Sequence, residues 1–229
     1  MEHAILVIIP LILSLTVHEY CHAGAAYLLN DQTAARMGRL TLNPIPHIDP
    51  IGTLVLPLVG ALTGGFLFGW AKPVPVQPYN FTRSISMRKG MLLVSLAGPA
   101  SNMALALLAS LLLFLLIQTG LIDKIGFVQL LYGQTGDGHT LAAAGIELLK
   151  IFIQLNIILA FFNMIPVPPL DGSKILAGIL PYKYGHYMEF LERYGFIILI
   201  VLLFSGVLNI VFYPASLLAN LLLTWPLMV

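Results

Sequence analysis

The distribution of apolar and charged residues divides the chain into long apolar stretches separated by short polar segments. Apart from Glu19, no Asp, Glu, Lys or Arg occurs in four of these stretches, at residues 3–30, 90–122, 151–170 and 194–229. An apolar stretch of about 18 or more residues with so few charges is typical of a membrane-spanning helix. The pattern therefore predicts spans at about 4–28, 91–118, 146–165 and 194–213, followed by an apolar tail at 214–229.

A fifth charge-free stretch, residues 51–70, has a different character because it contains five glycines and Pro57. Glycine and proline at this density weaken a straight helix. Non-helical backbone at membrane depth is tolerated only where protein or a water-filled cavity satisfies its polar groups. We therefore expect a re-entrant or hairpin segment around 51–78 that packs on the rest of the protein, with a full membrane crossing as the alternative.

The composition supports the membrane interpretation. Of the 229 residues, 59% are hydrophobic and 9% are charged, whereas soluble domains carry about 25% charged residues. The net charge of +1 offers no basic surface for nucleic acid, and a single cysteine excludes an intramolecular disulfide. The sequence thus predicts an all-α polytopic membrane protein that forms a single integral-membrane domain over 1–229, surrounded by the lipid bilayer. It leaves the oligomeric state open.

The positions of the basic residues predict the orientation. Residues 31–90 contain six of the eleven Lys and Arg residues, whereas 119–145 contains only Lys124. Because Lys and Arg are enriched in cytoplasmic loops, the segment 31–90 is expected in the cytoplasm. We therefore expect a multi-pass protein of the cell membrane in which the first and third spans end near the cytoplasmic face.

The first predicted span contains the sequence His18-Glu19-Tyr20-Cys21-His22. Residues four apart project from the same face of a helix, so His18 and His22 can bind one Zn²⁺. Glu19, on the adjoining flank, can act as a general base toward a metal-bound water. Ionisable residues inside an apolar span are costly and usually functional. The alternative is a pair of packing histidines that share a hydrogen bond with Glu19.

A catalytic zinc usually has three protein ligands and a water, so a third ligand is required. The strongest candidate is Asp171, which lies at the cytoplasmic end of the third span, at the same membrane level as the histidines. The prolines of 166–169 prevent regular helix before it, and Gly172 permits a sharp turn after it. The alternative is that Asp171 only caps a following helix.

Other side chains remain weaker candidates for the third ligand. His47 and Asp49 lie on the cytoplasmic side, and His186 could also reach that face. Cys21 is adjacent to His22 but lies about 100° around the helix from it, and we expect it to be a small packing residue.

Together these residues resemble the site-2 proteases, the intramembrane metalloproteases of peptidase family M50. In that family, His-Glu-x-x-His on one transmembrane helix and Asn-x-x-Pro-x-Pro-x-Leu-Asp-Gly near the end of a later one jointly bind a catalytic zinc. These patterns occupy 18–22 and 163–172 here, and residues 98–102 match the Gly-Pro-x-x-Asn of the middle core helix. The segment 38–53 resembles the compact bacterial and archaeal members, and the resemblance covers roughly 10–185.

The resemblance implies roles for individual residues. It implies that His18, His22 and Asp171 bind one Zn²⁺ per chain and that Glu19 is the catalytic acid and base. It also implies that Asn163 contacts the substrate backbone or stabilises an oxyanion. Asn102 is expected to have a structural role, binding backbone where helices cross.

The resemblance also implies an architecture. The catalytic core, about 4–185, would have three helices with the middle one antiparallel to the other two, followed by C-terminal spans at about 194–229. That arrangement requires an even number of crossings between residues 30 and 90, which favours the re-entrant interpretation. The PDZ and CBS domains of many family members are not expected.

The resulting hypothesis is an intramembrane zinc metalloprotease that hydrolyses peptide bonds in or near transmembrane segments of membrane-anchored proteins. A non-enzymatic zinc carrier or sensor could use the same ligands without needing Glu19 as a base. A zinc-dependent prenyl-peptidase is a second rival, but it usually completes its site with a downstream Glu, and Glu147, Glu189 and Glu192 lack a suitable motif.

Overall fold

The structure, a computed structural model, describes residues 2–63, 69–131 and 141–228, and every regular element in these ranges is helical. Among the described residues, four helices are long and apolar enough to cross a membrane: α1 (Glu2–Leu28), α4 (Met87–Gln118), α6 (Leu141–Asn163) and α9 (Asn209–Met228). The all-α polytopic fold expected from the sequence is confirmed.

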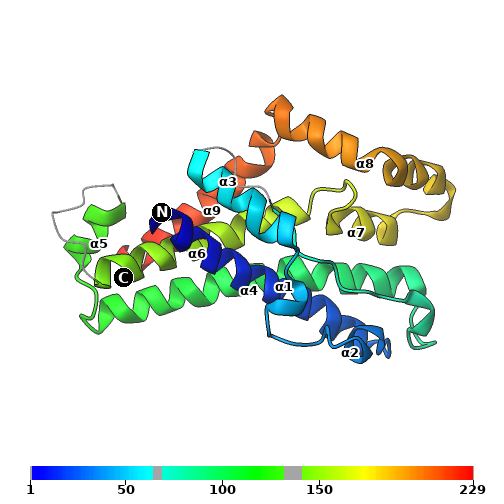
Figure 1. The fold of residues 1–229 in the computed structure, drawn as a ribbon, viewed down its shortest axis with the longest axis horizontal. Helices are drawn as coiled ribbons and strands as arrows, with labels where there is room; N and C mark the ends of the chain where they lie inside the picture. The colour runs from blue at the N-terminus through cyan, green and yellow to red at the C-terminus, as the bar shows by residue number, and fades with distance from the viewer. Residues whose placement is uncertain (1, 64–68, 132–140, 229) are drawn as a thin grey trace.

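Buried hydrogen bonds fix the relative directions of the three core helices. His18 and His22 of α1 contact Asn102 and Val94 of α4, so residue numbers rise along α1 as they fall along α4. Asn156 of α6 contacts Ser14, and the chain that follows α6 reaches His22, so α6 runs parallel to α1. The middle helix is therefore antiparallel to the other two. Figure 1 shows these three helices packed together.

The apolar surface of α4 divides into a packed face and an outer face. Ala106, Ala109 and Leu113 are buried in the largest apolar cluster, with α6 and α9 residues such as Ile153 and Ala219. The leucines at 107, 108, 111, 112 and 115 are all exposed. An apolar face of this size would be unfavourable in water but is suited to lipid, which explains how a chain with so little charge can be stable.

The first part of the predicted re-entrant segment is helical. A π-helical turn, η2 (Pro50–Val55), leads into α3 (Leu56–Thr63), and residues 64–68 lie outside the described residues. The Trp70 N–H donates to the carbonyl of Gly52 at 3.1 Å, and the Thr53 hydroxyl donates to the Trp70 carbonyl at 2.7 Å. Trp70 therefore lies beside Gly52 and Thr53, so the chain comes back to the place where the segment begins, as a re-entrant segment requires.

The single span predicted at 194–213 is wrong. Helix α8 (Gly185–Ser205) ends at Gly206, whose φ of 75° is left-handed, and α9 begins three residues later. A glycine in this conformation is a common helix terminator. No charge marks the break, so the apolar pattern runs through it. The candidate span is Asn209–Met228, which includes most of the tail predicted at 214–229.

Short helices connect these elements: α2 (Thr33–Arg36), η1 (Ile45–His47), η3 (Pro78–Asn80), α5 (Lys124–Leu131), α7 (Asp171–Ile179) and η4 (Tyr182–Tyr184). Of these, α7 is attached firmly to α4. Arg88 of α4 donates to the carbonyls of Ala177 and Leu180 at the end of α7. A Cβ at Gly178 would lie 2.6 Å from the Cβ of Leu92, so glycine permits this close packing. The attachment fixes the position of Asp171 at the opposite end of α7.

Candidate metal centre

The two histidines of the first span meet inside the core. His18 and His22 are 4% and 8% exposed, and their Nε2 atoms lie 3.0 Å apart. The separation of four residues on α1 places both rings on the same face, and they pack edge to face with centroids 4.6 Å apart. Their ring nitrogens therefore converge on one point that faces α4 and the beginning of α7.

Asp171 completes the cluster from a position 149 residues after His22. Its Oδ2 lies 3.1 Å from Nε2 of His18 and 3.1 Å from Nε2 of His22. Helix α6 ends at Asn163, and the proline-rich turn carries the chain to the first residue of α7. A Cβ at Gly172 would lie 2.3 Å from the Met164 carbonyl oxygen and 2.4 Å from that of Ile165, so this turn requires glycine.

The tautomers of the two imidazoles leave lone pairs facing one another. Nδ1 of His22 lies 2.7 Å from the Val94 carbonyl, which can only accept, so this nitrogen carries the proton. Nδ1 of His18 lies 2.6 Å from Oδ1 of Asn102, an amide oxygen that also accepts, so with this orientation of the amide Nδ1 carries the proton. Each neutral ring then has its lone pair on Nε2. Two lone pairs and a carboxylate oxygen that converge at this distance repel one another unless a cation binds between them.

These residues fit a zinc ion. Ligand atoms about 2.0 Å from a tetrahedral zinc lie about 3.3 Å apart, close to the separations of 3.0 and 3.1 Å among the three atoms. Among the residues that the structure describes, this cluster is the one group of three or more His, Cys, Asp or Glu side chains that could hold a metal ion. Two imidazoles and one carboxylate are a donor set typical of catalytic zinc, which keeps a fourth position open.

Helix α4 approaches the imidazoles through a glycine. A Cβ at Gly98 would lie 2.5 Å from Cε1 and Nε2 of His18 and 2.5 Å from Cε1 of His22. Any larger residue would displace both rings. The glycine of the Gly-Pro-x-x-Asn pattern is therefore part of the site, because it leaves room for the ligands.

Glu19 lies beside the cluster and is 8% exposed. Its Oε2 accepts a hydrogen bond of 2.8 Å from the Val74 N–H. Val74 belongs to residues 71–77, which have no regular secondary structure and lead from Trp70 to η3. One carboxylate oxygen of Glu19 is thus held by backbone. Within the described residues, Glu19 does not join the ligand cluster.

Buried polar residues attach both ends of the 71–77 segment. Arg39 donates to the carbonyls of Lys72 and Pro73, at 2.5 and 3.3 Å. At the other end, Asp31 accepts a hydrogen bond of 2.7 Å from the Gln77 N–H. The Val74 N–H therefore reaches Glu19 from a segment that is fixed on either side of it.

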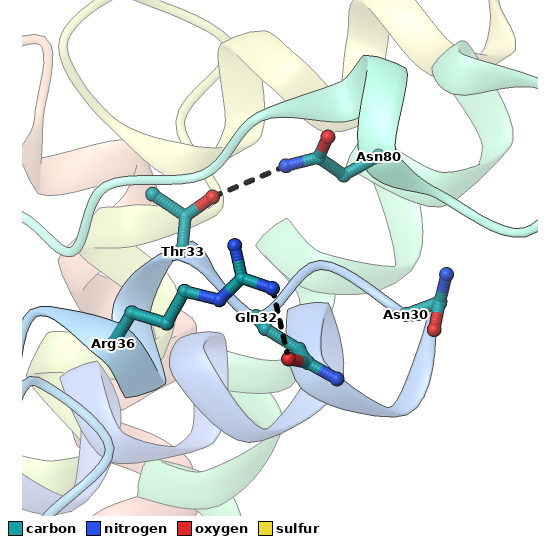
Figure 2. Close-up of a pocket in the computed structure, with 5 residues that line it drawn as sticks. All are labelled: Asn30, Gln32, Thr33, Arg36 and Asn80. Carbon is teal, nitrogen blue, oxygen red and sulfur yellow. Dashed lines mark hydrogen bonds between the residues drawn. The ribbon is translucent and has the colours of Figure 1, made fainter.

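The same aspartate holds the residues at the edge of a small polar pocket. Figure 2 shows Asn80 donating to the Thr33 hydroxyl and Arg36 donating to Gln32 along this pocket. Asp31 also accepts from Asn80 at 2.9 Å and from the Thr33 hydroxyl at 2.5 Å. These contacts join α2 to η3 outside the apolar core.

The alternative third ligands lie elsewhere. Nε2 of His47 donates to the Thr41 carbonyl at 2.9 Å, and Asp49 caps η2 by accepting from the amides of Ile51 and Gly52. His186 is exposed and packs against Tyr187. Cys21 is half-buried and does not belong to the cluster.

Asn163 is the last residue of α6, and its Nδ2 donates to the Leu159 carbonyl one turn earlier. The structure thus brings together His18, His22 and Asp171, while the Asn163 side chain donates a hydrogen bond within its own helix.

Sequence reasoning missed the second partner of each histidine. Asn102 was expected to bind backbone, but it contacts His18 and Asn156 through its side chain. Asn156 stands in the charge-free third span, and a buried amide among Ile and Leu was the only available signal. The Val94 carbonyl that contacts His22 leaves no signal in the sequence, because every residue has a carbonyl.

Comparisons with known proteins agree with this chemistry. The chain matches the model of "Peptidase family M50" over residues 6–205. It is 39% identical over 207 residues to "Putative zinc metalloprotease YwhC" of Bacillus subtilis, covering 90% of this chain and 84% of that protein. "Putative zinc metalloprotease Rip2" is 30% identical in Mycolicibacterium smegmatis and 31% identical in Mycobacterium tuberculosis H37Rv, each match covering 90% of this chain and 69% of the relative. No solved structure matches significantly.

Proposed function

This chain belongs to peptidase family M50, and we propose that it hydrolyses peptide bonds in or near the transmembrane segments of membrane-anchored proteins. It is an intramembrane zinc metalloprotease, as the family, its relatives and its four apolar helices indicate. The observation that carries the assignment of residues is the convergence of two Nε2 atoms and one carboxylate oxygen within 3.1 Å, inside the helical core.

In this proposal His18, His22 and Asp171 hold one zinc ion. When bound, zinc supplies Lewis acidity, which activates water and polarises a peptide carbonyl. The three ligands come from α1 and the beginning of α7. Since α4 packs against both of these helices, it keeps the ligands together.

Glu19 is the proposed general base and acid. It removes a proton from the attacking water and delivers a proton to the leaving amine. The Val74 N–H at 2.8 Å orients the carboxylate, while the second oxygen remains for proton transfer. A backbone donor suits this role because an amide N–H does not ionise at working pH.

Asn163 is proposed to contact the substrate backbone beside the metal. One of its amide hydrogens bonds to Leu159, so the other hydrogen and Oδ1 are available to a peptide. Asn163→Ala should therefore reduce activity while zinc remains bound. An unchanged activity would exclude this role.

The proposed orientation is the one that the basic residues predict, with the active site toward the cytoplasmic side of the cell membrane. A cysteine introduced at Arg83, between η3 and α4, tests it in a Cys21→Ser background. We expect a membrane-impermeant thiol reagent to label this cysteine only after the cells are opened. Labelling in intact cells would reverse the orientation.

The decisive experiment for the function is Glu19→Gln with a co-expressed single-span substrate. We expect cleavage to disappear while zinc content stays at the wild-type level, because the amide cannot act as a base. Glu147→Gln is the matched control: Glu147 pairs with Lys150 at 3.1 Å on α6, and its loss should affect neither property. If cleavage survives in Glu19→Gln, the proposed mechanism with Glu19 as base is wrong, and loss of zinc would make Glu19 a ligand.

A further inference from the structure

A chain of buried hydrogen bonds extends from His18 across α4 to α6. Nδ2 of Asn102 donates to Oδ1 of Asn156 at 2.9 Å. Nδ2 of Asn156 donates to the Phe152 carbonyl at 2.9 Å and to the Ser14 hydroxyl oxygen at 2.8 Å. Ser14, Asn102 and Asn156 are each 0% exposed, so water does not compete for these bonds. The chain joins three helices and ends at a proposed zinc ligand.

These hydrogen bonds can run in only one direction. The Phe152 carbonyl can only accept, so Asn156 must turn its NH₂ group toward it and Oδ1 toward Asn102. Asn102 must therefore donate to Asn156, which leaves its own Oδ1 facing His18. His18 must then carry its proton on Nδ1, and Nε2 keeps the lone pair that faces Asp171.

Asn102 alone cannot impose this tautomer. A half-turn of its amide exchanges Oδ1 and Nδ2 with almost no change in shape. With NH₂ toward His18, Nδ1 would accept, and the proton of the ring would move to Nε2, which points at the ligand cluster. His22 does not have this weakness, because its Nδ1 donates to the Val94 carbonyl, a backbone group that cannot exchange donor and acceptor.

We propose that Asn156 is a positioning residue that sets the tautomer of His18 through Asn102 and so keeps Nε2 available to the metal. The inference rests on the proposed zinc centre. Asn156 contacts none of the three ligands itself. Its effect comes from the direction of its amide, which the Phe152 carbonyl fixes.

The proposal is tested by zinc affinity, measured in full-length purified protein by competition with a chelator. Asn156→Leu is compared in two backgrounds, wild type and Asn102→Asp. A carboxylate presents two equivalent acceptors, so Asn102→Asp holds the proton on Nδ1 without any help from Asn156. We expect Asn156→Leu to weaken zinc binding about 10- to 100-fold in the wild-type background, the usual effect of a lost outer-shell partner, and hardly at all in the second.

Control variants separate this role from helix packing. Ser110→Ala removes another buried bond between spans, from Ser110 to the Leu222 carbonyl at 2.5 Å, and should leave zinc affinity unchanged. Asn156→Asp retains an acceptor for Asn102 and should bind zinc better than Asn156→Leu. It also provides the comparison with wild type if Asn156→Leu does not fold.

A second readout needs no metal. In zinc-free protein with ¹⁵N-labelled histidine, the ring resonances should show His18 protonated on Nδ1 in the wild type and a shift toward Nε2–H in Asn156→Leu. An unchanged tautomer, or an equal loss of zinc affinity in both backgrounds, would overturn the role of Asn156. If wild-type protein binds no zinc, or His18→Ala binds it equally well, the proposed zinc centre fails instead.

Discussion

Two buried aspartates join distant segments of this protein, and they differ in the groups that face them. Asp31 and Asp171 are 0% and 6% exposed. Asp31 accepts from the N–H and hydroxyl of Thr33, the Gln77 N–H and the Asn80 amide, all of which carry hydrogens. Asp171 faces two imidazole nitrogens whose protons are on the opposite side of each ring.

Burial of a carboxylate therefore does not by itself identify a metal site. Burial raises the pKa of Asp31, but the hydrogen bonds from Asn80, Gln77 and Thr33 outweigh it and hold the pKa below the ordinary range. That carboxylate is satisfied by its own donors and serves to attach the 71–77 segment. Oδ1 of Asp171 has the Lys174 ammonium 3.9 Å away, whereas Oδ2 faces the two unprotonated nitrogens, where a bound cation would complete its surroundings.

The largest contrast is expected between Asp171→Ala and Asp31→Ala. Loss of a zinc ligand should weaken zinc binding by more than the roughly 100-fold caused by a lost outer-shell partner, and should abolish cleavage. Asp31→Ala should retain its zinc. Zinc content per chain, measured by mass spectrometry, checks both. Undiminished zinc in Asp171→Ala would remove Asp171 from the site and direct attention to His47.

The next test concerns the space around the ligands. Gly98→Ala places a methyl group against both imidazoles, and a displacement of about 1 Å can cost roughly 100-fold in activity. Gly145→Ala is the control on α6, since a Cβ there meets nothing within 4 Å. We expect it to leave zinc affinity and cleavage unchanged. Similar kinetics for the two variants would mean that α4 does not restrict the rings.

A smaller effect is expected where the 71–77 segment contacts Glu19. Val74→Pro removes the N–H that donates to the carboxylate, and a hydrogen bond to a charged group is worth about 1.5–3 kcal/mol. Cleavage should fall about tenfold or more at unchanged zinc content. Val76→Pro is the matched control, because no hydrogen bond from the Val76 N–H occurs among the described residues. Equal loss in both variants would indicate a general distortion by proline.

The smallest effect concerns the attachment at Asp31 as pH changes. Since the folded pKa is lowered, this carboxylate contributes stability above the ordinary aspartate pKa of about 4, and the contribution is lost as pH falls through the folded value. The protection factor of the Gln77 amide, which is its intrinsic exchange rate divided by the measured rate at the same pH, should therefore stay constant near neutral pH and fall only below about pH 4. A protection factor that falls on acidification from about pH 7 to 6 would contradict this sign.

Much of the fold follows from the sequence because lipid imposes a simple rule on it. A helix satisfies its own backbone and needs only apolar side chains, so runs without charge locate α1, α4 and α6. The rule cannot locate a helix end at which no charged residue occurs. Gly206 ends α8 inside an apolar run, and the predicted span at 194–213 joined two helices for that reason.

The sequence by itself determined the chemistry of the centre: His18 and His22 share a helix face at a spacing of four, and Glu19 stands beside them. Local geometry fixes such relations. Only the tertiary structure decided that Asp171 meets both rings, that Gly98 leaves room for them, and that Asn156 can direct a histidine proton through Asn102. These depend on helices brought together from distant parts of the chain, where the position and direction of one hydrogen bond determine the next.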